Sequence, residues 1–306
     1  MTVTEHRVDV GGTTLALTEA GPPDGPAVVL LHGFPDSRQM WRAQVDALAA
    51  AGHRVLAPDL RGYGQSDRPA GTASYALPLL VEDVAGLMRA RGVGRAALVG
   101  HDWGAVLAWA VVAARPDLVD RLAVVSVGHP AARAAAGLEQ QVKGTYILAF
   151  LVPGLAERLL PLGGWWWLRR AWGGRSTAST PGLARQVEDM SRPGALTAAL
   201  SWYRANVPLP RPLGRRRARP RAAGAPPRVR RPVDCPVMGV WSTGDPVLTE
   251  AQMTGTAAHV AGPWRYERVQ GAGHWVPEDA PEHLSALLVD FLRPTVPGPG
   301  KGADRS

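Results

Sequence analysis

Apolar residues occur along this chain in short uninterrupted runs, and most runs are followed by a polar or glycine-rich stretch and then by helical spacing. Residues 27–31, 54–57, 96–99 and 122–127 form four such runs, in which Arg54 at the start of the second and Ser126 near the end of the fourth are the only polar residues. An apolar run of this length is typical of a strand buried on both faces. Strands that alternate with helices at this spacing predict a mostly parallel sheet with helices on both faces, which is an α/β fold.

The two ends of the predicted sheet show other patterns. Residues 7–10 and 13–18 alternate between apolar and polar positions and are joined by Gly11-Gly12, which predicts a hairpin. After a long interruption, the strand and helix patterns return in three segments: 236–241, 267–269 as the core of a last strand, and 281–292 as a closing helix.

The interruption has a composition of its own. From residue 130 to about 210 the chain has helical periodicity and no strand pattern. Five of the eleven tryptophans of the chain lie in this segment: Trp165, Trp166, Trp167, Trp172 and Trp202. We therefore expect a core formed by residues 1–129 and 232–306, a helical cap at 130–210 inserted after the sixth strand, and a linker at 211–231.

The charge of the chain is concentrated in that linker. The formal net charge is +8, and residues 211–231 contain nine arginines and no acid. No aromatic residue lies among these arginines, so the segment lacks the stacking groups typical of single-strand nucleic-acid binding. We expect a mobile, solvated loop and no nucleic-acid partner, and we also expect the tail from Pro294 to be disordered.

Cysteine content and hydropathy indicate the environment of the protein. The single cysteine, Cys235, excludes an internal disulfide framework and favours a reducing compartment, so we expect a cytoplasmic protein. Residues 1–10 have no apolar stretch typical of a signal peptide. Pro153 and Pro161 interrupt the most apolar region, residues 146–168, which argues against a membrane span. The oligomeric state remains open.

The candidate chemistry begins where the run 96–99 ends. Residues 100–104 read Gly-His-Asp-Trp-Gly, which has the form of a nucleophile elbow, a sharp turn between a strand and a helix. The central residue is Asp102, and a carboxylate there can attack a carbon atom and form an ester with it. The alternative interpretation is that Asp102 caps the helix that follows.

Two further groups follow later strands. Asp245 comes after the run 236–241, and His274 lies in a glycine-rich loop after the last strand. Loops at the carboxyl ends of parallel strands meet at one site. We therefore expect these two groups to lie close to Asp102. The order along the chain is nucleophile, acid and base, which is typical of the α/β-hydrolase fold, with Asp102, Asp245 and His274 in these roles.

An ester intermediate also needs donors for the negative charge that forms on its carbonyl oxygen. The backbone amide of Trp103, directly after the nucleophile, is one expected donor, and the amide of Phe34 in the loop after residues 27–31 is the other. His32 in the same loop is expected to shape the loop by hydrogen bonding. We find no Cys/His ligand cluster and no phosphate-binding glycine loop before Asp102, so we expect neither a metal nor a cofactor.

The motifs LLHGFPDS, PDLRGYGQSD, VGHDWGA, TGDP and GAGHW together resemble those of the α/β-hydrolase-fold epoxide hydrolases, in the same order. The resemblance extends over nearly the whole chain except residues 211–231 and the tail. It implies hydrolysis of a small apolar epoxide to a diol through an ester on Asp102. It also implies two cap tyrosines that donate to the epoxide oxygen, and Tyr146 and Tyr203 match their positions.

Other functions use the same scaffold. A haloalkane or haloacid dehalogenase also forms an ester on aspartate, but Phe34 replaces the Asn or Glu typical of haloalkane dehalogenases. Trp103 likewise replaces the Arg expected in a fluoroacetate-type dehalogenase. A non-catalytic binding protein of this fold is the second alternative, which an intact set of Asp102, Asp245 and His274 disfavours. An ordinary esterase would need a serine or cysteine at the elbow.

Overall fold

The computed structural model describes residues 3–171, 181–208 and 232–293. The predicted linker at 211–231 and the tail from Pro294 therefore lie outside the described residues. Among the described helices, none has both the length and the hydropathy that a membrane crossing requires.

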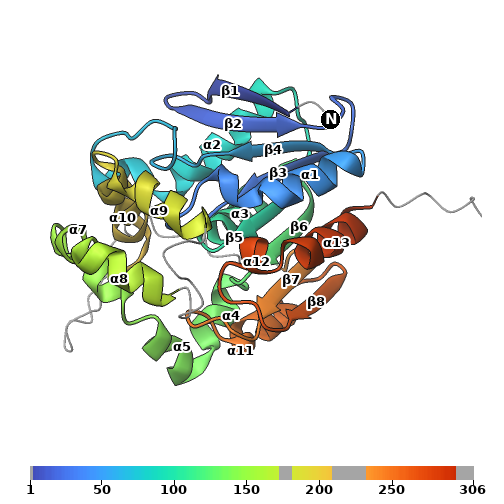
Figure 1. The fold of residues 1–306 in the computed structure, drawn as a ribbon. Coiled ribbons are helices and arrows are strands. Elements are labelled where there is room, and N and C mark those ends of the chain that lie inside the picture. The colour runs from blue at the N-terminus through green and yellow to red at the C-terminus, as the bar shows by residue number, and fades with distance from the viewer. Residues whose placement is uncertain (1–2, 172–180, 209–231, 294–306) are drawn as a thin grey trace, which may run out of the picture.

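One eight-stranded sheet forms the centre of the molecule, with the strand order β1-β2-β4-β3-β5-β6-β7-β8 (Figure 1). Strands β1 and β2 pair antiparallel, as do β2 and β4, and every other pair is parallel. The strands are β1 (Val3–Asp9), β2 (Thr14–Ala20), β3 (Ala27–Leu31), β4 (Arg54–Pro58), β5 (Ala96–His101), β6 (Val119–Val125), β7 (Val237–Ser242) and β8 (Trp264–Val269). The predicted hairpin and the mostly parallel sheet are confirmed.

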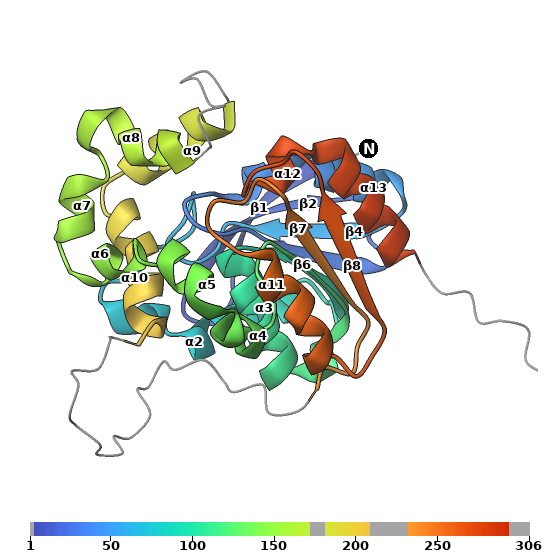
Figure 2. The same cartoon turned by 90° about the horizontal axis from the view of Figure 1, so that it is seen from below.

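Helices cover both faces of this sheet, as the alternating pattern predicts. Figure 2 shows α1, α12 and α13 on one face and α2, α3 and α11 on the other. These are α1 (Arg42–Ala50), α2 (Leu77–Ala90), α3 (Trp103–Ala114), α11 (Glu250–Thr254), α12 (Val276–Asp279) and α13 (Pro281–Leu292). Four short 3₁₀ helices join them: η1 (Arg38–Trp41), η2 (Thr72–Tyr75), η3 (Pro116–Leu118) and η4 (Gly255–His259).

The chain between β6 and β7 forms seven helices within the described residues. They are α4 (Pro130–Ala135), α5 (Gly137–Lys143), α6 (Ile147–Leu151), α7 (Leu155–Leu159), α8 (Leu162–Ala171), α9 (Pro181–Ser191) and α10 (Ala195–Asn206). Figure 2 shows α6 to α10 gathered beside the sheet. The backbone of α8 is interrupted at Gly163, Gly164 and Trp165, all of which have positive φ.

The register of the sheet brings the ends of three strands together. Gly100 of β5 pairs with Leu31 of β3 on one side and with Val124 of β6 on the other. Every residue of β5 and β7 is buried, as the uninterrupted apolar runs predict. The loops after β3, β5, β7 and β8 therefore start from fixed positions, and they carry the side chains described next.

Candidate active site

Asp102 occupies the turn between β5 and α3. Its backbone has φ 50° and ψ −118°, an unusual conformation for a residue with a side chain, and such conformations are concentrated at functional sites. A Cβ atom at Gly104 would collide with the backbone of β3 at Leu31, and one at Gly100 would collide with Gly104. The sharp turn therefore requires glycine at both flanks, as the elbow pattern predicts.

The carboxylate of Asp102 does not cap α3, because its side chain makes no capping hydrogen bond. Instead, the backbone N–H of Phe34 donates to Asp102 Oδ1 over 2.9 Å. The other oxygen, Oδ2, lies 3.7 Å from His274 Nε2. The helix-cap interpretation is therefore wrong, and the carboxylate faces the loops that follow β3 and β8.

Asp245 and His274 complete a chain of buried polar groups behind Asp102. The Nδ1–H of His274 donates to Asp245 Oδ2 over 2.9 Å. The other oxygen of Asp245 accepts the backbone N–H groups of Val247 and Leu248 at 2.7 and 2.9 Å. Both oxygens of the Asp245 carboxylate thus accept hydrogen bonds, so this carboxylate fixes the orientation of the imidazole ring.

The charges in this chain are strongly coupled. Burial disfavours the protonated imidazole, but the negative charges of Asp245 and Asp102 outweigh burial and raise the pKa of His274 to about 10. Burial would raise the pKa of Asp102, yet the hydrogen bond and charge of His274 hold that pKa below its usual value. At neutral pH, Asp102 is therefore an ionised carboxylate paired with a protonated His274.

The backbone carbonyl of His274 is held by two side chains that the sequence pattern does not identify. His101 Nε2 donates to this carbonyl over 2.9 Å, and the hydroxyl of Ser126 donates over 3.2 Å. Ser126 has φ 69° and is itself fixed, because the side-chain amide of Gln252 donates to its carbonyl over 2.7 Å. His101 could have been noticed inside the motif, whereas the unusual backbone of Ser126 leaves no trace in the sequence.

The loop that carries Phe34 is anchored by His32, which is fully buried. The backbone N–H of Leu60 donates to His32 Nε2 over 2.9 Å, so Nδ1 carries the proton and donates to the carbonyl of Gly33 over 3.0 Å. This arrangement agrees with the predicted loop-shaping role of His32. It places the Phe34 amide against Asp102, while the amide of Trp103 lies in the first turn of α3, where helical N–H groups have no partner within the helix.

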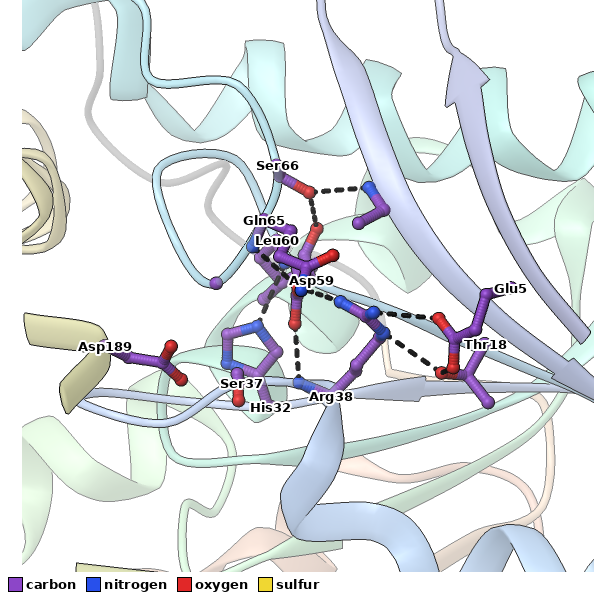
Figure 3. A network of polar contacts seen from close by, with 12 residues as sticks. Glu5, Thr18, His32, Ser37, Arg38, Asp59, Leu60, Gln65, Ser66 and Asp189 are labelled. Atoms are coloured by element: carbon purple, nitrogen blue, oxygen red, sulfur yellow. Dashed lines mark hydrogen bonds and ion pairs between the residues drawn. The ribbon is translucent and has the colours of Figure 1, made fainter. Parts of the chain in front are cut away.

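Asp59 joins this loop to the loop after β4 (Figure 3). Its carboxylate accepts the backbone N–H groups of Arg38 and Gln65, both at 2.8 Å, and forms an ion pair with the Arg38 guanidinium. The hydroxyl of Ser66 donates to the Asp59 carbonyl over 2.6 Å. Because these contacts are buried, the donor on Phe34 is held in position before any ligand binds.

Both predicted tyrosines lie across a cavity from Asp102. Tyr146 directly precedes α6, and Tyr203 lies on α10. The Tyr203 ring packs edge-on against the rings of Trp103 and Phe34, with centroids 5.0 and 5.6 Å apart. Burial, followed by nearby negative charge, raises the pKa of both phenols, so both are protonated donors at neutral pH.

The cavity has a volume of about 770 Å³, and Asp102, Trp103, Tyr146 and Tyr203 all line it. Most of its other lining residues are apolar: Leu77, Val106, Trp109, Ala110, Val127, Gly128, Pro130, Ala134, Gly144, Ile147, Leu148, Leu151, Val207, Pro208, Val247 and Leu248. The tryptophans at 165–167 are not among the lining residues. Trp165 is buried. The rings of Trp167 and Tyr146 pack together, with centroids 5.7 Å apart.

Comparison with known proteins adds independent information. The sequence model of the α/β hydrolase fold family matches residues 26–159. The chain is 34% identical over 329 aligned positions to Epoxide hydrolase A of Mycobacterium tuberculosis (strain ATCC 25618 / H37Rv), covering 94% of this chain and 97% of that protein.

Two solved structures are also similar. The crystal structure of Epoxide Hydrolase A from Mycobacterium thermoresistibile has 30% sequence identity and a TM-score of 0.77, and the match covers 95% of this chain and 98% of that one. An epoxide hydrolase of the alpha/beta hydrolases superfamily, from metagenomes of hot environments, has 29% identity and a TM-score of 0.81 with 95% and 99% coverage. The fold of nearly the whole chain is thus shared with solved epoxide hydrolases.

Proposed function

This chain belongs to the epoxide hydrolases of the α/β hydrolase fold, and we propose that it opens an epoxide through an ester on Asp102. The observation that carries this route is the position of the Asp102 carboxylate. It faces a cavity that also contains two protonated phenols, and it is paired with a histidine held by a second carboxylate. A nucleophile, a base with its orienting acid, and proton donors are thereby within one site.

Ring opening is the first step of the proposed route. An oxygen of Asp102 attacks an epoxide carbon, the carbon–oxygen bond of the ring breaks, and the electron pair goes to the epoxide oxygen. Tyr146 and Tyr203 donate hydrogen bonds to that oxygen, which stays bonded to the other carbon as an alkoxide and becomes a hydroxyl group when it takes up the proton of His274 or a proton from solvent. Help of this kind typically contributes ~10²–10⁴-fold to a rate. The product is a hydroxyalkyl ester of Asp102.

Hydrolysis of that ester is the second step. Alkylation removes the negative charge of Asp102, which is one of the two charges that raise the pKa of His274. Once its proton has passed to the alkoxide or to solvent, the neutral ring can deprotonate a water molecule. The resulting hydroxide attacks the ester carbonyl, and the Phe34 and Trp103 amides hold the oxyanion. The ester C–O bond then breaks, the alkoxide takes the proton that His274 removed from water and leaves as the diol, and the carboxylate of Asp102 is restored.

The substrate class follows from the walls of the cavity. Because most lining residues are apolar, we propose an epoxide with an apolar body, with water as the second substrate. We also propose that residues 130–210 act as a cap on a core of residues 1–129 and 232–306, since the cap supplies the tyrosines and the core supplies the other groups. We also propose a reducing, cytoplasmic location, since the chain has a single cysteine, Cys235, and it is a free thiol.

The test of this route is to stop it after ring opening. His274→Ala should leave alkylation of Asp102 possible while removing the base for hydrolysis, so an epoxide should add its mass to the peptide that contains Asp102. Intact-protein and peptide mass spectrometry would detect the adduct. Asp102→Asn is the matched control and should show no adduct under the same conditions.

The same assay should be run with haloalkanes in parallel, scoring diol formation and halide release. Diol without halide is the expected result. An unmodified His274→Ala protein after exposure to an epoxide that the wild type converts would contradict the ester route.

A further inference from the structure

Among the described residues that line the cavity, only one besides the nucleophile is charged. Asp102 and Arg133 are the two charged residues of this described lining. Arg133 lies on α4, and the cavity is lined by Pro130, Arg133 and Ala134, which are spaced as one face of a helix. Arg133 therefore lies on the face of α4 that lines the cavity.

This guanidinium has no acidic partner among the described residues. Arg133 is half-buried, and no ion pair or side-chain hydrogen bond within the described part of the chain includes it. The acids of adjoining segments are engaged elsewhere, because Glu139 pairs with Lys143 at 3.4 Å and Asp245 pairs with His274. A partly buried arginine is usually matched to a carboxylate or phosphate, so five N–H donors remain available here.

Contacts between α3 and the segment that leads into α4 set the length of the cavity wall between Asp102 and α4. The Trp109 indole N–H donates to the Val127 carbonyl over 3.2 Å, and the Trp109 ring packs edge-on against that of His129, which precedes α4, with centroids 5.2 Å apart. Trp109 is seven residues after Asp102, and the helical rise makes this about 10 Å. Trp103, Val106 and Ala110 line the cavity along this length.

The charge of Arg133 also acts on Tyr146. Burial and Asp102 raise the pKa of this phenol, and the positive charge of Arg133 opposes them. Arg133 and Tyr146 both line the cavity, so the two side chains are near enough for their charges to interact.

We propose that Arg133 binds an anionic group at the far end of the substrate, so that the enzyme prefers epoxides carrying a carboxylate over neutral epoxides of equal length. This inference rests on the proposed function, because it concerns the substrate of the same site. The body of such a substrate remains apolar, in keeping with the other walls, and only its end carries charge. A carboxylate matches the planar fork of a guanidinium.

The experiment compares two probes, ω-epoxydecanoate and ω-epoxydecanamide, which differ only in the charge of the end group. Their chains are about as long as the stretch of α3 between Asp102 and Trp109. We expect the wild type to show a kcat/KM about tenfold higher for the acid. Arg133→Gln should remove this preference by lowering kcat/KM for the acid about tenfold more than kcat/KM for the amide, with the loss for the acid mainly in KM.

Arg158→Gln is the matched control, because Arg158 is exposed on α7 and does not line the cavity. It should retain the preference for the acid, and Arg133→Lys should retain part of it. An equal loss for acid and amide in Arg133→Gln would overturn the proposal, since Arg133 would then act on the reaction itself. A wild type that does not distinguish the two probes would also overturn it.

Binding can be measured without turnover, which separates this inference from the proposed function. In Asp102→Asn, calorimetry should show that ω-epoxydecanoate binds about tenfold more tightly than the amide, and that adding Arg133→Gln abolishes the difference. If neither probe yields a diol with the wild type, the proposed function fails, while this binding comparison still supports or refutes the role of Arg133.

Discussion

Asp102 and His274 form an ion pair before the reaction and lose it when the ester forms. The pKa of His274 is raised to about 10 by Asp245 and Asp102 against the opposing effect of burial, so the free enzyme holds a protonated imidazole at neutral pH. Ring opening needs only the carboxylate form of Asp102, whose pKa is lowered. Hydrolysis needs a neutral His274, and the two steps therefore have different pH requirements.

This difference predicts two separate pH profiles. With ester hydrolysis rate-limiting, kcat should rise with pH through the pKa of His274 in the ester, which lies below that of the free enzyme because Asp102 is then uncharged. By contrast, kcat/KM reports ring opening and should stay flat across the neutral range. Steady-state profiles on one epoxide would measure both.

Asp245→Asn tests the cause of the shift. Since the charge of Asp245 raises the pKa of His274, its removal should move the rise in kcat to lower pH, together with a lower maximal rate. An acid limb that appears equally in kcat and kcat/KM would argue against the assignment of His274 to the second step.

Tyr146 and Tyr203 provide the next prediction. Each hydroxyl can donate to the epoxide oxygen, so Tyr146→Phe or Tyr203→Phe alone should lower the rate of ring opening by ~10–10²-fold, and the double variant by ~10³-fold or more. Single-turnover formation of the Asp102 ester in a His274→Ala background measures this step directly. Tyr266→Phe is the control, because Tyr266 lies on β8 outside the cavity lining and its hydroxyl donates a hydrogen bond to Glu250. Ring opening that survives the double substitution would exclude the phenols as donors.

The sequence indicates some residues of this site better than others. Asp102, Asp245 and His274 can be found because each follows a strand, and Phe34 because it follows the run 27–31. The partners of the His274 carbonyl cannot be found in this way. Their role depends on which buried side chain reaches a backbone carbonyl distant in sequence, and no local pattern encodes that contact.

At the scale of elements, the β5–α3 turn depends on how closely α3 approaches β3. Gly104→Ala should be strongly destabilising, because its Cβ would meet the backbone carbonyl of Leu31, which cannot move aside as a flexible side chain could. We expect a loss of about 3 kcal/mol or more in the free energy of unfolding. Urea denaturation measures it.

Gly94→Ala is the matched control, since a Cβ there meets no atom within 4 Å and the residue precedes β5 in an open turn. It should be nearly neutral. If Gly104→Ala were equally neutral, the close approach of α3 to β3 would not be the reason for glycine in the elbow.

Elements differ in how well the sequence predicts them. The strand at 27–31 and the helix at 281–292 have the predicted bounds, because uninterrupted burial and regular amphipathic spacing mark them clearly. The last strand is longer than its predicted core at 267–269 and begins at Trp264. Its early residues are only half-buried and alternate aromatic and charged side chains, so no apolar run marks its start. Two consecutive glycines account for the break inside α8. The sequence alone does not predict that the backbone there is left-handed, nor that Trp165 shares this conformation.

At the scale of the whole molecule, one ion cluster joins the helices between β6 and β7 to both catalytic loops. Arg185 on α9 bonds Asp36 at 2.7 Å and also bonds Glu278 on α12. Gln186 donates to the other oxygen of Asp36 over 2.6 Å. Asp36 follows Phe34 by two residues, and Glu278 follows His274 by four, so α9 connects the oxyanion donor to the base.

Arg185→Ala should therefore affect both stability and catalysis. It would leave the buried carboxylate of Asp36 and the partly buried one of Glu278 without their shared cation, and such a loss costs about 3 kcal/mol. Thermal unfolding and kcat measure the two effects. Glu188→Ala, at an exposed position on the same helix, should leave both unchanged. A stable, fully active Arg185→Ala enzyme would show that the cluster does not hold the loops in place.

The hydrogen bonds and the ion pair of Asp59 have a consequence for protein engineering. Because Asp59, Arg38 and His32 bind across the loops after β3 and β4, these two loops form one exchangeable module rather than two. A chimera or library that replaces only one of them would separate a buried carboxylate from its donors. Diversification for new substrates is therefore better directed to the walls of the cavity, while the two loops are transplanted together from a single parent.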